Sequence, residues 1–215
     1  MDAESARLGG DTTSRTQAQR TAMSDRAMID AAIELILERG TGKTTLAAIG
    51  ERAGYSRGLA TYRFGSKAGL FDQICRQISK RWINFLVEEV GDESGIEAMC
   101  AATDAYYRFV SELPDDARVL QILYHDAASP ESDFRQTAID VYQRQRNDVE
   151  EWVRRGIEAG AIRSDADPQS EAVRFVAYIA GISYMWMLMP HAVDFSTVHA
   201  DYKEEIRRNL EPQSS

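Results

Sequence analysis

Cysteine is scarce in this chain of 215 residues, which contains only Cys75 and Cys100. A framework of disulfide bonds is therefore excluded, and the reducing cytoplasm is the compartment that the cysteine content favours. The first residues are polar and lack the apolar core of a secretory signal peptide. Because 44% of the residues are hydrophobic and 27% are charged, we expect an ordinary globular protein in the cytoplasm.

Catalytic and metal-binding sequence patterns are missing as well. Neither the G-x-S-x-G elbow nor the G-x-G-x-x-G turn occurs, and His125, His191 and His199 have no ligand spacing and no nearby cysteine pair. Gly42-Lys43-Thr44 resembles the end of a P-loop, but Leu37 stands where that motif needs a glycine. We therefore expect no enzymatic activity, no metal and no cofactor.

Strand patterns and membrane-spanning runs are also absent from the sequence. No segment alternates apolar and polar residues between hairpin turns, so no strand is predicted. The longest apolar run extends from Phe175 to Met189, which is shorter than the ~20 residues that a bilayer requires. A helix that is apolar on all sides is buried on all sides, and this one would pack on its own bundle and on a second copy of the chain.

Helical periodicity dominates the rest of the chain. Expected helices are Met28 to Leu37, ended by Gly40; a short one with Leu46, Ile49 and Ala53 after a Thr44 or Thr45 cap; Arg57 to about Phe64 after Ser56; and Lys67 to about Val90 after Ser66. Further apolar stripes run from Ile96 to Val110, and in helices opened by Pro114, Pro130 and Pro168 or capped by Ser196. The prediction is an all-α protein of about nine helices.

Charge is distributed unevenly along the chain, although the total is −9. Residues 1 to 80 carry a net +3, and residues 81 to 215 carry a net −12. Between Lys43 and Lys67 five basic residues accompany one acid, Glu51. Because polyanions attract Lys and Arg, this short basic segment is the place to look for a nucleic-acid contact.

The basic segment also contains a characteristic pair of short helices. Ala53-Gly54-Tyr55-Ser56 forms a tight turn between them, which is the spacing of a helix-turn-helix whose second helix enters the major groove of DNA. Two helices of an ordinary bundle would have the same spacing. The second helix, however, carries Arg57, Gly58, Thr61, Tyr62 and Arg63, an unusual surface for a core helix and one able to contact bases and phosphates.

The run from Thr44 to Phe71, TTLAAIGERAGYSRGLATYRFGSKAGLF, resembles the DNA-binding domain of TetR-type transcriptional repressors. The resemblance is close over about residues 24 to 75 and looser over the helical remainder, including Gly156 to Arg163 and Asp167-Pro168. It implies an N-terminal helix-turn-helix domain joined to a C-terminal helical bundle for ligand binding and dimerisation. The expected division is a flexible arm at 1–23, a DNA-binding domain at 24–69, and an effector-binding and dimerisation domain at 70–215.

The resemblance also implies roles for individual residues. In the family a tyrosine near the end of the recognition helix, a lysine opening the next helix and threonines opening the first helix hold phosphates, and Tyr62, Lys67 and Thr45 match these positions. Arg15 and Arg20 of the arm are candidates for a minor-groove contact. The predicted DNA-binding residues are Thr45, Ser56, Arg57, Gly58, Thr61, Tyr62, Arg63 and Lys67.

Aromatic residues of the C-terminal region suggest a ligand cavity. Phenol and indole groups combine apolar area with a polar tip, which suits a cavity for a mostly apolar small molecule, although each one alone could simply be core. The predicted ligand-binding residues are Trp82, Tyr106, Tyr107, Tyr142 and Trp152.

The last two helices are the expected dimer interface, since the resemblance implies a four-helix contact between two copies. The predicted interface residues are Tyr178, Ile182, Met185, Trp186, Met189, Tyr202 and Ile206.

The sequence therefore favours a cytoplasmic homodimeric repressor that binds double-stranded DNA at a roughly palindromic operator and is released by a small-molecule effector. The long helix from Lys67 to about Val90 would connect the two sites. A helical protein-interaction adaptor, or a small-molecule carrier without DNA binding, is the alternative that the acidic C-terminal part would also fit.

Overall fold

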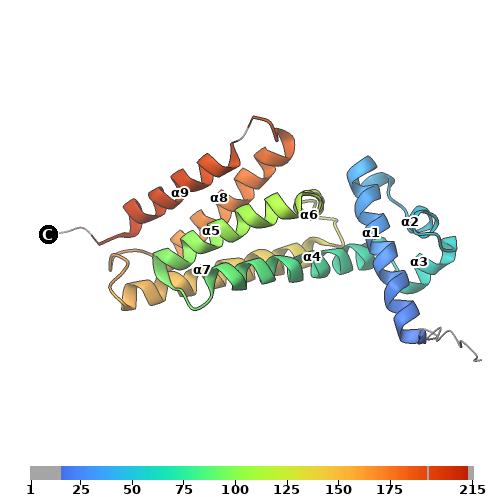
Figure 1. Cartoon of the computed structure of the whole chain (residues 1–215), viewed down its shortest axis with the longest axis horizontal. Coiled ribbons are helices and arrows are strands. Elements are labelled where there is room, and N and C mark those ends of the chain that lie inside the picture. The colour runs from blue at the N-terminus through green and yellow to red at the C-terminus, as the bar shows by residue number, and fades with distance from the viewer. Residues whose placement is uncertain (1–15, 193, 213–215) are drawn as a thin grey trace, which may run out of the picture.

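The computed structural model describes residues 16–192 and 194–212, and all regular structure within these ranges is helical (Figure 1). The described helices are α1 (Gln17–Lys43), α2 (Leu46–Arg52), α3 (Arg57–Phe64), α4 (Lys67–Val90), α5 (Gly95–Glu112), α6 (Pro114–Ala127), α7 (Arg135–Glu158), α8 (Pro168–Leu188) and α9 (Phe195–Leu210). The prediction of an all-α fold with about nine helices is confirmed.

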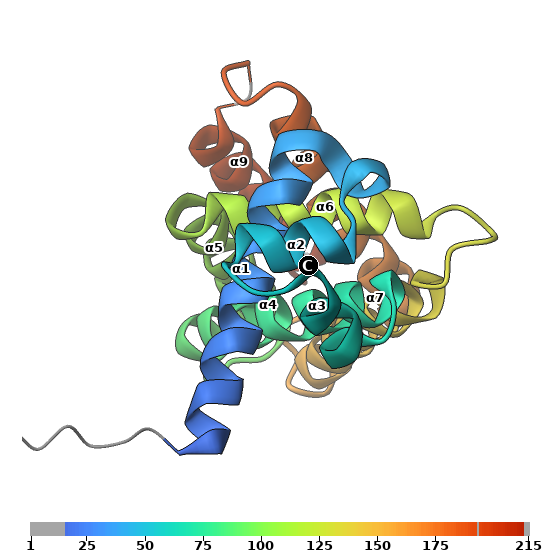
Figure 2. The same cartoon turned by 90° about the vertical axis from the view of Figure 1, so that its right-hand side faces the viewer.

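The helices form two groups that α4 connects. Helices α1, α2 and α3 gather at one end of an elongated molecule, and α4 runs from them along the body formed by α5 to α9 (Figure 1). Helices α8 and α9 lie along one edge of that body, which Figure 2 shows from the end that carries α1 to α3. Of the described helices, none is both long enough and apolar enough to cross a membrane, as the length of the apolar run in α8 led us to expect.

Helix α1 begins earlier than expected, which corrects the predicted arm at 1–23. The hydroxyl of Thr16 accepts a hydrogen bond from the Gln19 backbone N–H, and the Gln19 side chain accepts one from the Thr16 N–H. This capping box, followed by good helix formers, starts the helix at Gln17 although no apolar stripe marks this segment. Arg20 therefore lies in α1, whereas Arg15 and the rest of 1–15 lie outside the described residues.

Gly40 interrupts α1 where the sequence analysis placed its end. Its φ of 76° lies in the left-handed region that glycine tolerates best, and its carbonyl accepts a hydrogen bond of 2.8 Å from the hydroxyl of Thr44. The last turn to Lys43 thus changes direction and leads the chain into α2.

Two further helix starts, and the cap of a third helix, differ from the expectation. Helix α7 begins at Arg135 after the buried Phe134, five residues beyond Pro130, because the intervening residues form turns. Asp194, instead of Ser196, caps α9 by accepting a hydrogen bond from the Thr197 backbone N–H. Ser56 occupies the N-cap of α3 without forming a side-chain hydrogen bond.

The core is continuous between the two groups of helices. Leu70 and Phe71, in the first turn of α4, are buried together with Met28 and Ile36 of α1 and with Leu123 of α6. A second apolar cluster, formed mainly by α5, α7, α8 and α9, lies further along the body. The start of α4 therefore packs against α1 as well as against the body.

Candidate nucleic-acid interface and ligand cavity

The turn between α2 and α3 is tightly packed. The Tyr55 backbone N–H donates a hydrogen bond of 2.8 Å to the Gly50 carbonyl, and Gly54 takes a φ of 79°. A Cβ at Gly50 would lie 2.7 Å from the Ser56 carbonyl oxygen, which is too close for any side chain. Gly50 and Gly54 thus let the two short helices meet in the geometry of a helix-turn-helix.

Helix α3 has one fully outward face. Arg57, Gly58, Thr61 and Tyr62 lie on it at helical spacing and all four are exposed. The Tyr62 side chain is 82% exposed although it is large and aromatic. Four of the predicted DNA-binding residues therefore share one accessible surface.

Arg63 lies on the other face of α3, with Leu59 and the buried Ala60. Its guanidinium forms a forked pair with the Asp25 carboxylate of α1, in which Nε donates to Oδ1 at 2.7 Å and Nη2 donates to Oδ2. The Asp25 hydrogen bond raises the pKa of Arg63 above its usual value, so the guanidinium stays charged. In this structure the Arg63 side chain, which is 29% exposed, is paired with Asp25 of α1 and does not stand free beside Tyr62.

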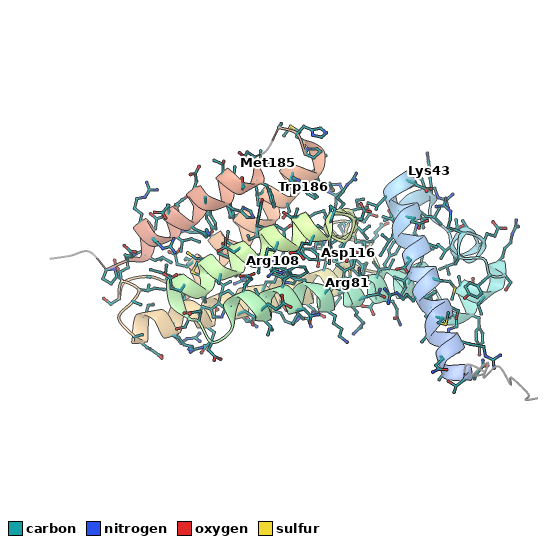
Figure 3. The ribbon with its side chains drawn as sticks, viewed as in Figure 1. Lys43, Arg81, Arg108, Asp116, Met185 and Trp186 are labelled. Atoms are coloured by element: carbon teal, nitrogen blue, oxygen red, sulfur yellow. The ribbon has the colours of Figure 1, made fainter. Side chains whose placement is uncertain are left out.

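The other predicted contacts lie at the edges of α2 and α4. The Thr45 hydroxyl accepts a hydrogen bond of 3.2 Å from the Ala48 backbone N–H and so caps α2, while the side chain remains exposed. Lys67 opens α4 after the Ser66 cap, and its Nζ lies 5.6 Å from the centre of the Phe71 ring. Lys43 projects from the end of α1 on the same group of helices (Figure 3).

A cavity of about 450 Å³ lies within the body, between α4, α5, α6, α7 and α8. Four of the five predicted ligand-binding residues line it: Trp82, Tyr106, Tyr142 and Trp152. Tyr107 does not line this cavity, because consecutive helical residues point about 100° apart. Tyr107 instead stacks on Phe195 at a ring distance of 6.2 Å, beside a second, shallower pocket.

The inner wall of the cavity is mostly apolar with neutral polar groups. Trp82 contacts the rings of Tyr106 and Phe109 edge to face, at 5.7 Å in each case. The Tyr106 hydroxyl pairs with that of Ser183, and burial raises the pKa of Tyr106 to about 12, so it stays protonated. The sequence analysis missed Phe109 and Tyr124, although Phe109 lies one helical turn after Tyr106.

Charged residues line the cavity where α4 faces α7. Asp72 accepts hydrogen bonds from Arg76 at 2.7 Å and from the Thr137 hydroxyl at 3.2 Å. Asp148 and Arg144 lie further along α7, and burial raises the pKa of the Asp148 carboxyl. The cavity therefore has an aromatic interior and a charged rim on these two helices.

Helix α8 presents an exposed apolar face that includes only part of the predicted interface. Its exposed large side chains are Val173, Tyr184, Met185, Leu188 and Met189, with Leu188 58% exposed. Met185 and the partly buried Trp186 are visible near the end of α8 in Figure 3. Met185 and Met189 of the prediction are thus accessible, and Trp186 partly so.

The remaining four predicted interface residues pack within their own chain, Ile182 and Ile206 completely and Tyr178 and Tyr202 in part, so the prediction is corrected for Ile182 and Ile206. Ile182 and Ile206 are buried, and the rings of Tyr178 and Tyr202 stack on each other at 3.4 Å. Because α8 is apolar on every side, its sequence could not indicate which side α9 covers.

Two family profiles match the chain. Residues 28–74 match the profile described as bacterial regulatory proteins, tetR family, and residues 101–211 match that of the BetI-type transcriptional repressor, C-terminal. A helix-turn-helix with an exposed recognition face, attached to a helical body that holds a cavity, is the architecture of a DNA-binding regulator with an effector domain. The chain belongs to the tetR family of bacterial regulatory proteins.

Relatives agree with this assignment. The HTH-type transcriptional regulator TtgR of Pseudomonas putida is 25% identical over 177 residues, covering 78% of this chain and 81% of TtgR. The complex of SmeT from Stenotrophomonas maltophilia with triclosan has a TM-score of 0.76 at 20% identity, covering 89% of this chain and 93% of that one. A putative regulator from Saccharomonospora viridis in complex with choline also has a TM-score of 0.76 at 20% identity, covering 89% and 100%.

The protein is a ligand-responsive, DNA-binding transcriptional repressor. The alternative of a helical adaptor or carrier without DNA binding is not favoured.

Proposed function

We propose that the protein acts in the cytoplasm as a homodimer that binds a roughly palindromic operator and leaves it when a mostly apolar small molecule enters the cavity. Residues 24–69 form its DNA-binding domain, and residues 70–215 form its effector-binding and dimerisation domain. Two copies related by a two-fold axis would present their α3 helices to major grooves about 34 Å apart, one turn of DNA. Binding alone, without catalysis, accounts for the activity.

The outward face of α3 is the observation that carries the DNA-binding proposal. Arg57 and Thr61 can donate hydrogen bonds to base edges, and Gly58 between them allows the backbone to approach the groove. The large Tyr62 side chain is exposed and is not part of the core, so packing does not account for a tyrosine at this position. Binding of a phosphate would use its hydroxyl. Thr45, Ser56 and Lys67 would hold phosphates around this face.

The cavity supports the proposed effector class. Its volume falls within the ~300–1,000 Å³ of ordinary small-molecule sites, and its inner wall is largely aromatic. The related SmeT structure holds triclosan, and the related regulator from Saccharomonospora viridis holds choline. Since these molecules differ widely, the effector class is inferred from the cavity wall of this chain. Its aromatic residues include Trp82, Tyr106, Tyr142 and Trp152.

Helices α4 and α6 connect the cavity with the DNA-binding domain. Trp82 lies in the cavity wall, while Lys67 begins the same helix at the DNA-binding end. Arg81 of α4 forms an ion pair of 2.6 Å with the buried Asp116 of α6, where the two helices meet (Figure 3). An effector that favours a different spacing of these helices must weaken DNA binding, by linkage.

A gel-shift titration tests the DNA-binding proposal. DNA flanking the gene, and failing that an operator obtained by selection from random duplexes, is titrated with the wild type, Lys67→Ala and Tyr62→Phe at two salt concentrations. We expect the slope of log affinity against log salt to be shallower by about one unit in Lys67→Ala, because one phosphate contact is lost. Tyr62→Phe should weaken binding. Lys80→Ala in the effector domain removes the same charge and should bind like the wild type.

Failure of the wild type to bind any selected duplex would overturn the proposal. If Lys67→Ala and Lys80→Ala lost the same DNA affinity, the effect would be due to net charge. Lys67 would then not belong to the DNA-binding surface.

A further inference from the structure

The arginines of the helix-turn-helix are paired with acidic residues, whereas its lysines are not. Arg52 binds Glu38 through two hydrogen bonds of 2.8 Å and Glu34 through one of 3.1 Å, and Arg57 pairs with Glu51. Arg63 pairs with Asp25. Within residues 16–192 and 194–212, no carboxylate lies within ion-pair distance of Lys43 or Lys67. The acids of α1 therefore compensate much of the positive charge that the sequence shows between residues 43 and 67.

The Arg63–Asp25 pair differs from the Arg57–Glu51 pair in its surroundings. The side chains of Arg63 and Asp25 are 29% and 31% exposed, whereas those of Arg57 and Glu51 are 77% and 50% exposed. Exposed single ion pairs contribute little and exchange readily with water or phosphate, while two parallel bonds in a partly enclosed place hold a guanidinium firmly. Arg57 is thus available to DNA, and Arg63 is held back.

We propose that Asp25 is a specificity-determining residue, which holds the Arg63 guanidinium against α1 and so withholds one cation from the DNA backbone. The inference rests on the DNA-binding surface proposed above. Affinity for DNA of any sequence grows with the number of phosphates that Lys and Arg neutralise, whereas sequence is read by base contacts from the outward face of α3. Holding Arg63 back lowers the affinity for unrelated DNA and leaves the base contacts intact. It therefore increases the ratio of operator affinity to the affinity for unrelated DNA.

The same pair also fixes α3 on α1. Asp25 and Arg63 are 38 residues apart in the chain, and the planar fork allows little rotation of the guanidinium. The orientation of Arg57, Thr61 and Tyr62 relative to α1 therefore depends partly on this contact. Arg63 acts as a positioning residue and does not itself contact DNA.

The experiment measures binding of the full chain to a short mixed-sequence duplex by fluorescence anisotropy over a range of salt concentrations. Asp25→Asn should steepen the slope of log affinity against log salt by about 0.9 and tighten binding at low salt, because the freed Arg63 neutralises one more phosphate. Arg63→Ala should keep the wild-type slope. The double variant Asp25→Asn/Arg63→Ala should also keep it, since no guanidinium is left to be freed.

Glu158→Gln, an exposed position at the end of α7, is the matched control because it removes one negative charge far from α3. It should leave the slope unchanged. A steeper slope in Glu158→Gln equal to that in Asp25→Asn would overturn the inference, and so would a shallower slope in Arg63→Ala. If Asp25→Asn unfolds, Arg63→Ala decides the question alone, since the proposal requires its slope to match the wild type.

The operator obtained by selection completes the test. The ratio of operator to mixed-sequence affinity should fall in Asp25→Asn, and an unchanged ratio would contradict the inference while leaving the proposed function intact. A wild type that binds no duplex would instead contradict the proposed function.

Discussion

The hydroxyl of Thr41 in α1 donates a hydrogen bond to the Asp126 carboxylate in α6. These residues are 85 positions apart, and their contact joins a helix of the DNA-binding domain to a helix whose Leu120 and Tyr124 line the cavity. Helix α6 therefore lines the cavity and also contacts α1 of the DNA-binding domain. The contact offers a second route between them beside the long α4.

Removing this bond should weaken communication between the sites. Thr41→Val keeps the shape of the side chain and removes the donor, so we expect the factor by which an effector lowers operator affinity to fall several-fold, within the ~5–150-fold range of ordinary allosteric coupling. The measurement is a titration of the selected operator with and without an effector found by screening. Thr41→Ser, which keeps the hydroxyl, should behave like the wild type, and equal coupling in Thr41→Val would exclude a role for the bond.

A substitution at Gly58 should change the stability of the protein and its affinity for DNA in opposite directions. In the described structure a Cβ at this position has no neighbour within 4 Å. Gly58→Ala should therefore raise the free energy of unfolding by about 0.5–1 kcal/mol, because alanine favours the helix. If the backbone of α3 approaches DNA here, the same variant should lose about tenfold in operator affinity, or about 1.4 kcal/mol. Chemical unfolding and anisotropy titration measure the two effects, and undiminished affinity would show that DNA does not approach this position.

Tryptophan fluorescence should report occupancy of the cavity. Trp82 and Trp152 line it, whereas Trp186, the third tryptophan of the chain, lies beside the second pocket. A ligand in the cavity should quench the emission of Trp82 and Trp152. Trp82→Phe and Trp152→Phe should each reduce the quenching, and Trp186→Phe should retain it. Quenching that disappears in Trp186→Phe would place the ligand in the second pocket.

The exposed face of α8 should form the dimer contact. Leu188→Glu introduces a charge into this apolar face, which a second copy would have to bury without a partner. We expect monomers at concentrations where the wild type is dimeric, as measured by light scattering. Val87→Glu, on the equally exposed Val87 of α4, is the control and should stay dimeric. A dimeric Leu188→Glu would move the interface away from this end of α8.

His199 should make stability depend on pH. It is buried among α5, α8 and α9, where Tyr178 contacts Nδ1 at 3.2 Å and Nε2 has no partner in the described structure. Burial lowers the pKa of His199 to about 4, with Asp104 opposing and Lys203 reinforcing the shift. The unfolded chain then binds a proton below about pH 6.5 that the folded protein does not, so stability falls as the pH decreases from about 6.5 to about 4.

The size of this effect can be isolated by substitution. Between about pH 7.5 and about pH 5 the free energy of unfolding of the wild type should fall by roughly 2 kcal/mol more than that of His199→Phe. Denaturant unfolding at the two pH values measures it. His191→Phe, at an exposed position, should retain the wild-type dependence, and an equal pH dependence in His199→Phe would show that another group is responsible.

The sequence by itself determined the helical fold, the helix-turn-helix and the outward face of α3. Glycines, N-cap residues and apolar spacing act within a few residues, and Arg57, Gly58, Thr61 and Tyr62 share a face because of helical geometry alone. Four of the five aromatic residues chosen for the cavity line it for a similar reason, since they lie on inward faces of long helices.

The tertiary structure decided which side of each helix meets which neighbour. The pairing of Asp25 with Arg63, the packing of Tyr178 on Tyr202 and the exclusion of Tyr107 from the cavity all depend on helices that are distant in the chain. Periodicity identifies residues that share a face, but the element that covers this face is set by packing of the whole chain. Helix α8 shows this most clearly, because its apolar sequence fits α9, the cavity or a second copy equally well.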